Sequence, residues 1–212
     1  MHRSDSYRIR GDADRAIADA NEAIRLDPSS SAAYGNRGNA YSLRRDFQRA
    51  IADYNEAIRL NPASPVAFYN RGNAYNSLKN FNRAIADYSQ ALILHPEFPE
   101  ALTHRGKSYS AQRKYDLALK DFNAAIKLSP NYSTAYFDRG ALHHAMENFE
   151  AAIADYTEAI RTNPRNADAF YNRGIIFFDT GRRQLAIEDF KRAADLGDKD
   201  AIEELQKLGV RH

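Results

Sequence analysis

Residues 67–96 have the sequence AFYNRGNAYNSLKNFNRAIADYSQALILHP, and a closely related pattern returns every 34 residues along the chain. A proline marks the end of each pattern: Pro28, Pro62, Pro96, Pro130 and Pro164. A glycine preceded by an arginine recurs at the same interval: Gly38, Gly72, Gly106, Gly140 and Gly174. Self-similarity at a fixed period indicates a repeat architecture, and it must be interpreted before any division into domains.

Each repeat is predicted to form two α-helices. Apolar residues recur at three- and four-residue spacing, which is typical of helices, and they lack the alternation of strands. Tyr34, Gly38 and Tyr41 share one helix face, and a polar turn at residues 44–46 precedes a second helix that ends before Pro62. Neither helix can bury its apolar stripe alone, so neighbouring helix pairs must stack into an elongated array.

Two structural contacts are predicted inside each repeat. We expect Gly38 to let two helix backbones approach closely, with the small residues Ala50 and Ala57 on the facing side. An aspartate follows each arginine by sixteen residues, a spacing that places the two opposite each other in an antiparallel helix pair. The predicted ion pairs are Arg37–Asp53, Arg71–Asp87, Arg105–Asp121, Arg139–Asp155 and Arg173–Asp189, with Arg3–Asp19 as a further candidate.

These repeats resemble the tetratricopeptide repeat (TPR) family. The resemblance is carried by the period of 34 and by one set of positions: Tyr34, Gly38, Tyr41, Ala50, Tyr54, Ala57 and Pro62. The next repeat carries them as Phe68, Gly72, Tyr75, Ala84, Tyr88, Ala91 and Pro96, and the variant here has Asn-Arg-Gly or a relative before the glycine. The resemblance implies an all-α, right-handed superhelical α-solenoid of stacked antiparallel helix pairs. It also implies a concave groove that binds partner peptides, and no catalysis.

The whole chain, residues 1–212, is interpreted as one array. Residues 1–30 form a truncated first repeat that starts partway through its first helix, and we expect this start to be a cut in a longer array. Full repeats follow at 31–64, 65–98, 99–132, 133–166 and 167–197. Residues 198–209 are predicted to form a C-terminal capping helix, which begins at Asp198 and carries one apolar stripe, so we expect this end to be natural.

Composition argues against several classes of function. Thirty basic and 28 acidic residues leave a net charge of +2, too small to indicate a nucleic-acid or anionic-membrane partner. No apolar run approaches the roughly 20 residues of a membrane helix, and no signal-peptide core follows Met1, so we expect a cytoplasmic chain with no membrane partner. The absence of cysteine excludes disulfides and thiolate zinc sites.

No enzyme, cofactor or metal site is predicted. The sequence lacks phosphate-binding loops, the HExxH zinc motif and the GxSxG nucleophile motif. His143, His144 and Glu147 come nearest to a metal cluster, but His143 occupies an aromatic packing position and should point away from His144.

The candidate functional surface is one face of the first helices. Eighteen of the 24 aromatic residues occupy packing positions, whereas four others share the face that the TPR resemblance assigns to the concave groove: Tyr69, Phe137, Tyr171 and Phe178. The same face carries polar residues: Asn39, Asn73, Asn76 and Lys107, with Asn36, Asn70 and His104 at its border. Asparagines can donate to and accept from an extended peptide backbone, so we predict a protein or peptide partner held by asparagines and anchored by aromatic residues.

Other interpretations stay open. The four aromatic residues could simply complete a partly buried face. A clamp for a terminal carboxylate is disfavoured because Gly35, Val66, Tyr69 and Glu100 stand where such clamps carry basic or other specific residues. An RNA-binding helical repeat would need a basic groove, and a structural spacer within a larger protein would need none. Self-association through the truncated first repeat is a further prediction, because that end should expose part of its apolar interface.

Overall fold

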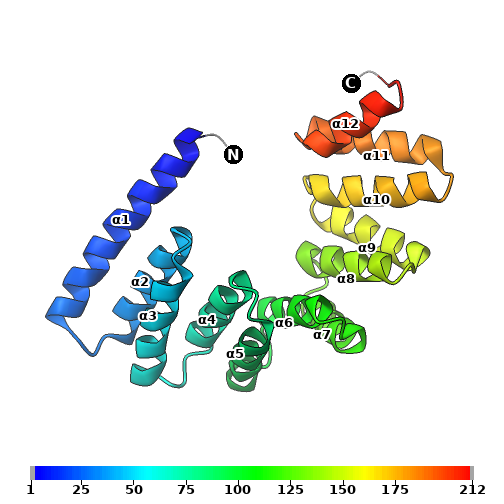
Figure 1. Ribbon diagram of the computed structural model, residues 1–212. Coiled ribbons are helices and arrows are strands. Elements are labelled where there is room, and N and C mark those ends of the chain that lie inside the picture. Colours follow the sequence, from blue (N-terminus) through cyan, green and yellow to red (C-terminus); the bar gives the residue numbers. More distant parts are fainter. Residues whose placement is uncertain (1–2, 211–212) are drawn as a thin grey trace. The chain divides into compact units, whose positions relative to one another are not determined.

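The computed structural model describes residues 3–210, with side chains from residue 12 onward, and these residues form twelve helices and no strand (Figure 1). In chain order the helices are α1 (Arg3–Leu26), α2 (Ser31–Leu43), α3 (Phe47–Leu60), α4 (Pro65–Ser77), α5 (Phe81–Leu94), α6 (Pro99–Ala111), α7 (Tyr115–Leu128), α8 (Ser133–Ala145), α9 (Phe149–Thr162), α10 (Ala167–Asp179), α11 (Arg183–Asp195) and α12 (Lys199–Lys207). The predicted all-α class is confirmed.

The helices pack in chain order within two compact units. In the first unit, Met1–Arg113, α2 pairs with α3 and α4 with α5, while α1 packs on α2, α3 on α4 and α5 on α6. In the second unit, Lys114–His212, α8 pairs with α9 and α10 with α11, while α7 packs on α8, α9 on α10 and α11 on α12. Within each unit every helix pair therefore buries its apolar side by packing against its neighbours.

Local sequence signals set the helix ends, as the repeat at 65–98 illustrates. Ser64 caps α4 by accepting a hydrogen bond from the Ala67 backbone N–H at 3.3 Å, and Pro65 takes the first helical position, where its missing N–H costs nothing. In the predicted polar turn, Lys79 adopts a left-handed conformation with φ of 57°. His95 ends α5 in an extended conformation, because the following proline disfavours helical angles there.

The repeated glycines make room for an aromatic ring. A Cβ atom added to Gly72 would lie 2.7 Å from Cε1 of Tyr88, and one added to Gly38 would lie 2.7 Å from Cε1 of Tyr54. The side-chain atoms nearest to Gly38 therefore belong to Tyr54 rather than to the predicted Ala50 and Ala57. Ala50 is buried, but the group that needs the missing side chain is the tyrosine ring of the second helix.

The Arg–Asp pairs are confirmed where both partners lie in one unit. In four repeats the guanidinium Nε and Nη2 donate to the two carboxylate oxygens of the aspartate at 2.6–2.8 Å: Arg37–Asp53, Arg71–Asp87, Arg139–Asp155 and Arg173–Asp189. Arg105 and Asp121 belong to different units, so that pair stays a prediction. The Arg3–Asp19 candidate lies outside the described side chains.

The first repeat departs from the sequence prediction. The chain from Arg3 to Leu26 is one continuous helix, whereas the truncated repeat at 1–30 predicts the remainder of a first helix, a turn and a second helix. Ala13 and Ala20 stand where later repeats carry Phe47 and Tyr54. Without those rings little favours a hairpin over helix propagation, which adds one hydrogen bond per residue. At the other end α12 begins after Asp198, which caps it by accepting from the Ala201 N–H at 2.8 Å.

Candidate functional site

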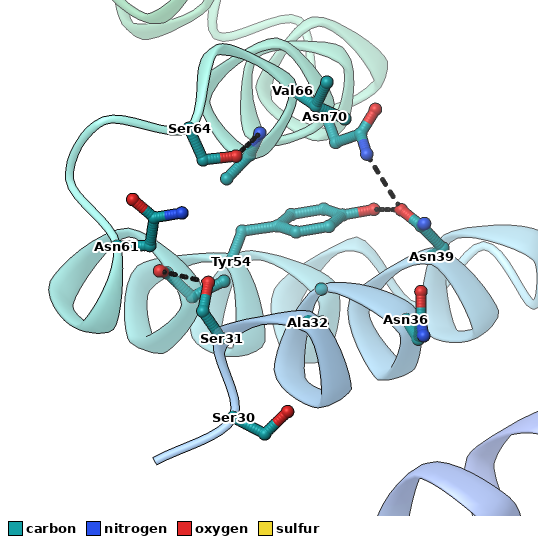
Figure 2. A pocket seen from close by; sticks show the side chains of 13 residues that line it. Ser30, Ser31, Ala32, Asn36, Asn39, Tyr54, Asn61, Ser64, Val66 and Asn70 are labelled. Carbon is teal, nitrogen blue, oxygen red and sulfur yellow. Dashed lines mark hydrogen bonds between the residues drawn. The ribbon is translucent and has the colours of Figure 1, made fainter.

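The predicted groove residues of the first unit form a hydrogen-bonded surface on α2, α4 and α6. The carboxamide oxygen of Asn39 accepts two hydrogen bonds, one from the Tyr54 hydroxyl at 2.8 Å and one from Nδ2 of Asn70 at 3.0 Å (Figure 2). Tyr54 belongs to the same repeat as Asn39, whereas Asn70 belongs to the next. This asparagine therefore ties its own helix pair to the following one.

The same arrangement recurs one repeat later. The carboxamide oxygen of Asn73 accepts from the Tyr88 hydroxyl at 2.7 Å and lies 2.7 Å from Nδ1 of His104. A carbonyl oxygen can only accept, so Nδ1 of His104 carries the proton. Burial, assisted by the nearby charge of Lys107, lowers the pKa of His104 to about 4, and the ring is therefore neutral at pH 7.

A third contact between repeats extends this surface. The Ser108 hydroxyl donates to the carboxamide oxygen of Asn76 at 3.1 Å. Three predicted groove asparagines thus use their oxygen atoms to join α2 to α4 or α4 to α6. The sequence analysis predicts that these asparagines both donate to and accept from a peptide. In the structure their side-chain oxygens already accept hydrogen bonds from neighbouring residues. Nδ2 of Asn39 makes no hydrogen bond to the described residues 12–210, whereas the side chain of Asn73 also makes a hydrogen bond to the Tyr69 hydroxyl.

Three of the four predicted aromatic anchors take part in packing. Tyr69 stacks on His104 with ring centroids 5.4 Å apart and planes at 13°, and it also contacts Phe98 at 4.9 Å. In the second unit Phe137 lies 5.7 Å from the ring of Tyr156, and Tyr171 lies 5.9 Å from that of Phe190. All three side chains are half-buried.

Phe178 differs from the other predicted anchors, because 41% of it is exposed on α10. Asn36 on α2 and Lys107 on α6 are also exposed. The predicted site residues therefore fall into two kinds. Asn36, Asn39, Lys107 and Phe178 are exposed, whereas the other predicted site residues are half-buried in the packing of the repeats.

A hollow of about 480 Å³ opens between α2, the end of α3 and the start of α4 (Figure 2). Its apolar lining includes Tyr54, Ala57 and Val66, and its polar rim comprises serine and asparagine side chains: Ser30, Ser31, Asn36, Asn39, Asn61, Ser64 and Asn70. Gly35 also lines it. Sequence reasoning missed this hollow, although one signal was present, since Gly35 is the single glycine at a position that is aromatic in three other repeats.

A second hollow of about 500 Å³ lies between α1 and α2. It is lined mainly by small and aliphatic residues, among them Ala16, Ala20, Ala23 and Leu43, and it shares Asn36 and Asn39 with the first hollow. Ala20 occupies the position of Tyr54 in the following repeat. The space therefore arises where the first repeat lacks its aromatic side chain.

Models of the tetratricopeptide repeat match residues 1–30, 31–64, 65–98, 99–132 and 137–201. The chain belongs to the tetratricopeptide repeat family. No curated protein matches its sequence. TPR repeats are generally non-catalytic interaction modules, and membership supports a protein-interaction scaffold as the role of this chain.

Solved structures of TPR proteins have the same fold. YrrB is 25% identical with a TM-score of 0.64, and the match covers 89% of this chain and 97% of YrrB. MamA from Desulfovibrio magneticus RS-1 is 22% identical with a TM-score of 0.68, covering 78% and 94%. Cut9 in its complex with Hcn1 is 16% identical with a TM-score of 0.80, covering 92% of this chain and 39% of the other.

Neither a membrane-spanning helix nor a metal-binding cluster occurs in the described part of this TPR chain. Its helices include none that is both long and apolar enough to cross a membrane. Among the side chains described, no three His, Asp or Glu residues are grouped to hold a metal ion. His143 lies 3.9 Å from the carboxylate of Asp155, while His144 packs edge-on against Phe149, so the two histidines have separate surroundings.

Proposed function

We propose that the chain is a non-catalytic scaffold that binds an extended segment of a partner protein across the first helices of its repeats. In the first unit the segment would lie on the asparagine face, which we define as Asn36, Asn39, Asn70, Asn73, Asn76 and His104. The observation that carries the proposal is the pair of fixed asparagines. Asn39 and Asn73 have their oxygens held from two sides, so that their Nδ2 donors are oriented before any partner arrives.

Orientation of these donors matters for affinity. A side chain that is already held in one rotamer loses little entropy when it binds, so each donor can contribute most of its hydrogen-bond energy. The carbonyl groups of an extended peptide are the acceptors that match carboxamide N–H groups without demanding a particular side chain. Asn39 is exposed and Asn73 half-buried, and a segment crossing both would span two successive repeats.

In the second unit the corresponding face would supply apolar contacts. Phe137 and Tyr171 expose part of their rings, and Phe178 exposes more. Interface cores are enriched in aromatic residues and poor in charge. YrrB is a TPR protein with an unusual peptide-binding site, and its likeness to this chain supports a peptide as the class of ligand.

The experiment starts from a library of random twelve-residue peptides displayed on phage and selected on the full chain. A selected peptide is then titrated into Asn39→Asp with Asn73→Asp. Aspartate keeps the oxygen that Tyr54 and Tyr88 need but removes the N–H donor. We expect the double variant to bind at least tenfold more weakly, as measured by isothermal titration calorimetry, because two oriented hydrogen bonds are lost.

The matched control is Asn82→Asp, the same chemical change on α5, away from the asparagine face. Asn82 accepts a hydrogen bond from Gln112 at 2.7 Å through the oxygen that aspartate retains. Binding should stay within twofold of the parent. Equal weakening by the control, or unchanged binding by the double variant, would show that the asparagine donors do not hold the peptide.

Self-association through the first repeat is proposed as a further property. Leu26 on α1 and Leu43 on α2 are 69% and 62% exposed, and the hollow between the two helices is lined mainly by small apolar side chains. A second copy could cover this surface with its own α1. Sedimentation velocity over a hundredfold concentration range tests this, and a mass that stays monomeric throughout would remove the proposal.

A further inference from the structure

Two glycines in α2 differ in what surrounds them. Gly38 is required by packing, because a Cβ atom there would meet the ring of Tyr54 at 2.7 Å. A Cβ atom on Gly35 would meet nothing within 4 Å. Glycine weakens a helix interior, and no contact within the described chain calls for one at Gly35. Such a glycine commonly marks a place where something outside the chain approaches the backbone.

Equivalent positions in other repeats show what fills this space. Tyr69, Phe137 and Tyr171 replace Gly35 at intervals of 34 residues, and Thr103 does so in the remaining full repeat. Each of the three rings lies 5.7–5.9 Å from the ring of the second helix, with planes tilted by 43–52°. These separations are typical of favourable aromatic pairs. The repeat therefore has a built position for an aromatic ring, and α2 leaves it empty.

The hollow at Gly35 has a lining that suits such a ring. Tyr54 and Ala57 contribute to its apolar lining, and Val66, of which 54% is exposed, stands at its α4 side (Figure 2). Several rim groups are already satisfied, since the Ser31 hydroxyl donates to the Ala57 carbonyl at 2.9 Å and Ser64 caps α4. A mostly apolar ligand group can therefore enter the hollow while these serine hydroxyls keep their hydrogen bonds.

We propose that the hollow at Gly35 receives one aromatic side chain, tyrosine or phenylalanine, from the partner segment. The ring would occupy the position that Tyr69, Phe137 and Tyr171 occupy in their own repeats, against Tyr54 and beside Val66. This inference rests on the proposed function, because Asn36 and Asn39 belong both to the hollow and to the asparagine face. It adds a specificity element to a face whose other contacts are to backbone groups.

The probe is N-acetyl-tyrosine amide, titrated into the ¹⁵N-labelled full chain and followed by two-dimensional NMR. We expect saturable shifts of the Gly35 amide and of the neighbouring amides of α2 and α4. N-acetyl-leucine amide, similar in backbone but without a ring, should bind at least fivefold more weakly. Absence of saturable shifts with the tyrosine probe, or equal binding of the leucine probe, would overturn the proposal.

Gly35→Tyr supplies the ring from the chain itself and should weaken binding of the tyrosine probe at least tenfold. Gly35→Ala places a methyl group beside the position proposed for the ligand ring, so it should also weaken binding of the tyrosine probe, by about threefold, less than Gly35→Tyr does. The tyrosine variant should remain folded, since Tyr69 and Tyr171 occupy the same place, and thermal melting checks this. Unchanged probe binding by a folded Gly35→Tyr variant would also overturn the proposal.

The two proposals fail separately. The asparagine donors are tested with selected peptides and the Asp variants, whereas the hollow is tested with single amino-acid amides. If the tyrosine probe binds but the Asp variants bind the selected peptide normally, the proposal of an aromatic pocket stands and that of the asparagine donors fails. If the Asp variants weaken peptide binding but the tyrosine probe does not bind, the asparagine donors stand and the aromatic pocket fails.

Discussion

Asp87 accepts two parallel hydrogen bonds from Arg71, at 2.8 Å from Nε and 2.6 Å from Nη2. The carboxylate is almost enclosed, with 8% of the side chain exposed. The remaining terminal nitrogen, Nη1, donates to the side-chain oxygen of Asn55 in the preceding repeat at 2.7 Å. One guanidinium group therefore links the two helices of its own repeat and also binds that repeat to the preceding one.

Arg71→Met should lower the free energy of unfolding by about 3–5 kcal/mol, because it leaves the Asp87 carboxylate buried without a partner. Urea unfolding followed by circular dichroism measures this. The control is the double variant Arg71→Met with Asp87→Leu, which removes both charges. It should recover most of the loss, and a double variant as unstable as Arg71→Met would contradict the buried-charge explanation.

The two glycines of α2 should respond in opposite directions to the same substitution. Gly35→Ala should stabilise the chain by about 0.5–1 kcal/mol, because alanine favours the helix and its methyl group meets open space. Gly38→Ala should destabilise it by about 1–3 kcal/mol, because the methyl group overlaps the Tyr54 ring. Thermal melting distinguishes the two, and a stabilising Gly38→Ala would show that the ring moves aside freely.

Tyr88→Phe should cost about 0.5–1.5 kcal/mol, because it removes one of the two hydrogen bonds that hold Asn73. Chemical unfolding gives the magnitude. Tyr75→Phe is the matched control, since Tyr75 is half-buried in the same repeat and its hydroxyl makes no hydrogen bond to the described part of the chain. Similar losses for both variants would mean that the Asn73 contact adds nothing of its own.

Stability should fall as pH decreases from about 6.5 to about 4, in part because of His104. Its pKa is near 4 in the folded chain against a usual value of 6.5. The unfolded state therefore binds the proton more readily throughout this window, and above it both states are neutral. The contribution of His104 is about 3 kcal/mol in total.

The His104 effect is isolated by comparing unfolding curves of the parent with those of His104→Asn across this pH window. Asparagine, which other repeats carry at this position, can still donate to Asn73. The variant should lose part of the pH dependence between 6.5 and 4. A His95→Gln control, changed at an exposed site, should keep it. Identical slopes for parent and His104→Asn would show that the ring titrates normally.

The repetition made most of the fold predictable. A constant spacing of sixteen residues placed Arg37 opposite Asp53 because antiparallel helices joined by a fixed turn pair residues symmetrically about that turn. The prediction of a helix, a turn and a second helix failed at α1. The 34-residue period shows which positions correspond between repeats, but it does not show whether the aromatic residues that stabilise a helix pair are present there. Ala13 and Ala20 occupy the right places and are too small to hold one.

The candidate site was less predictable. Helical periodicity indicated the face on which Asn39 and Tyr69 lie, but not how deeply each side chain sits. Whether the Asn39 oxygen is available to a ligand depends on whether the Tyr54 hydroxyl and Asn70 already donate to it. The distance between Asn39 and Asn70 is set by how neighbouring repeats stack, which the sequence pattern does not give. The hollow at Gly35 exists because this residue has no side chain. The repeat motif is defined by the residues that recur, so it does not indicate a space of this kind.

The arginines have a wider consequence. Four guanidinium groups, those of Arg37, Arg71, Arg139 and Arg173, contact a polar residue sixteen positions earlier, such as Asn21 for Arg37 or Thr157 for Arg173, and an aspartate sixteen positions later. Gain or loss of one 34-residue block would leave every surviving arginine with an equivalent partner on each side. A gene encoding such a chain can therefore lengthen or shorten by unequal recombination while each new junction inherits chemistry that already fits.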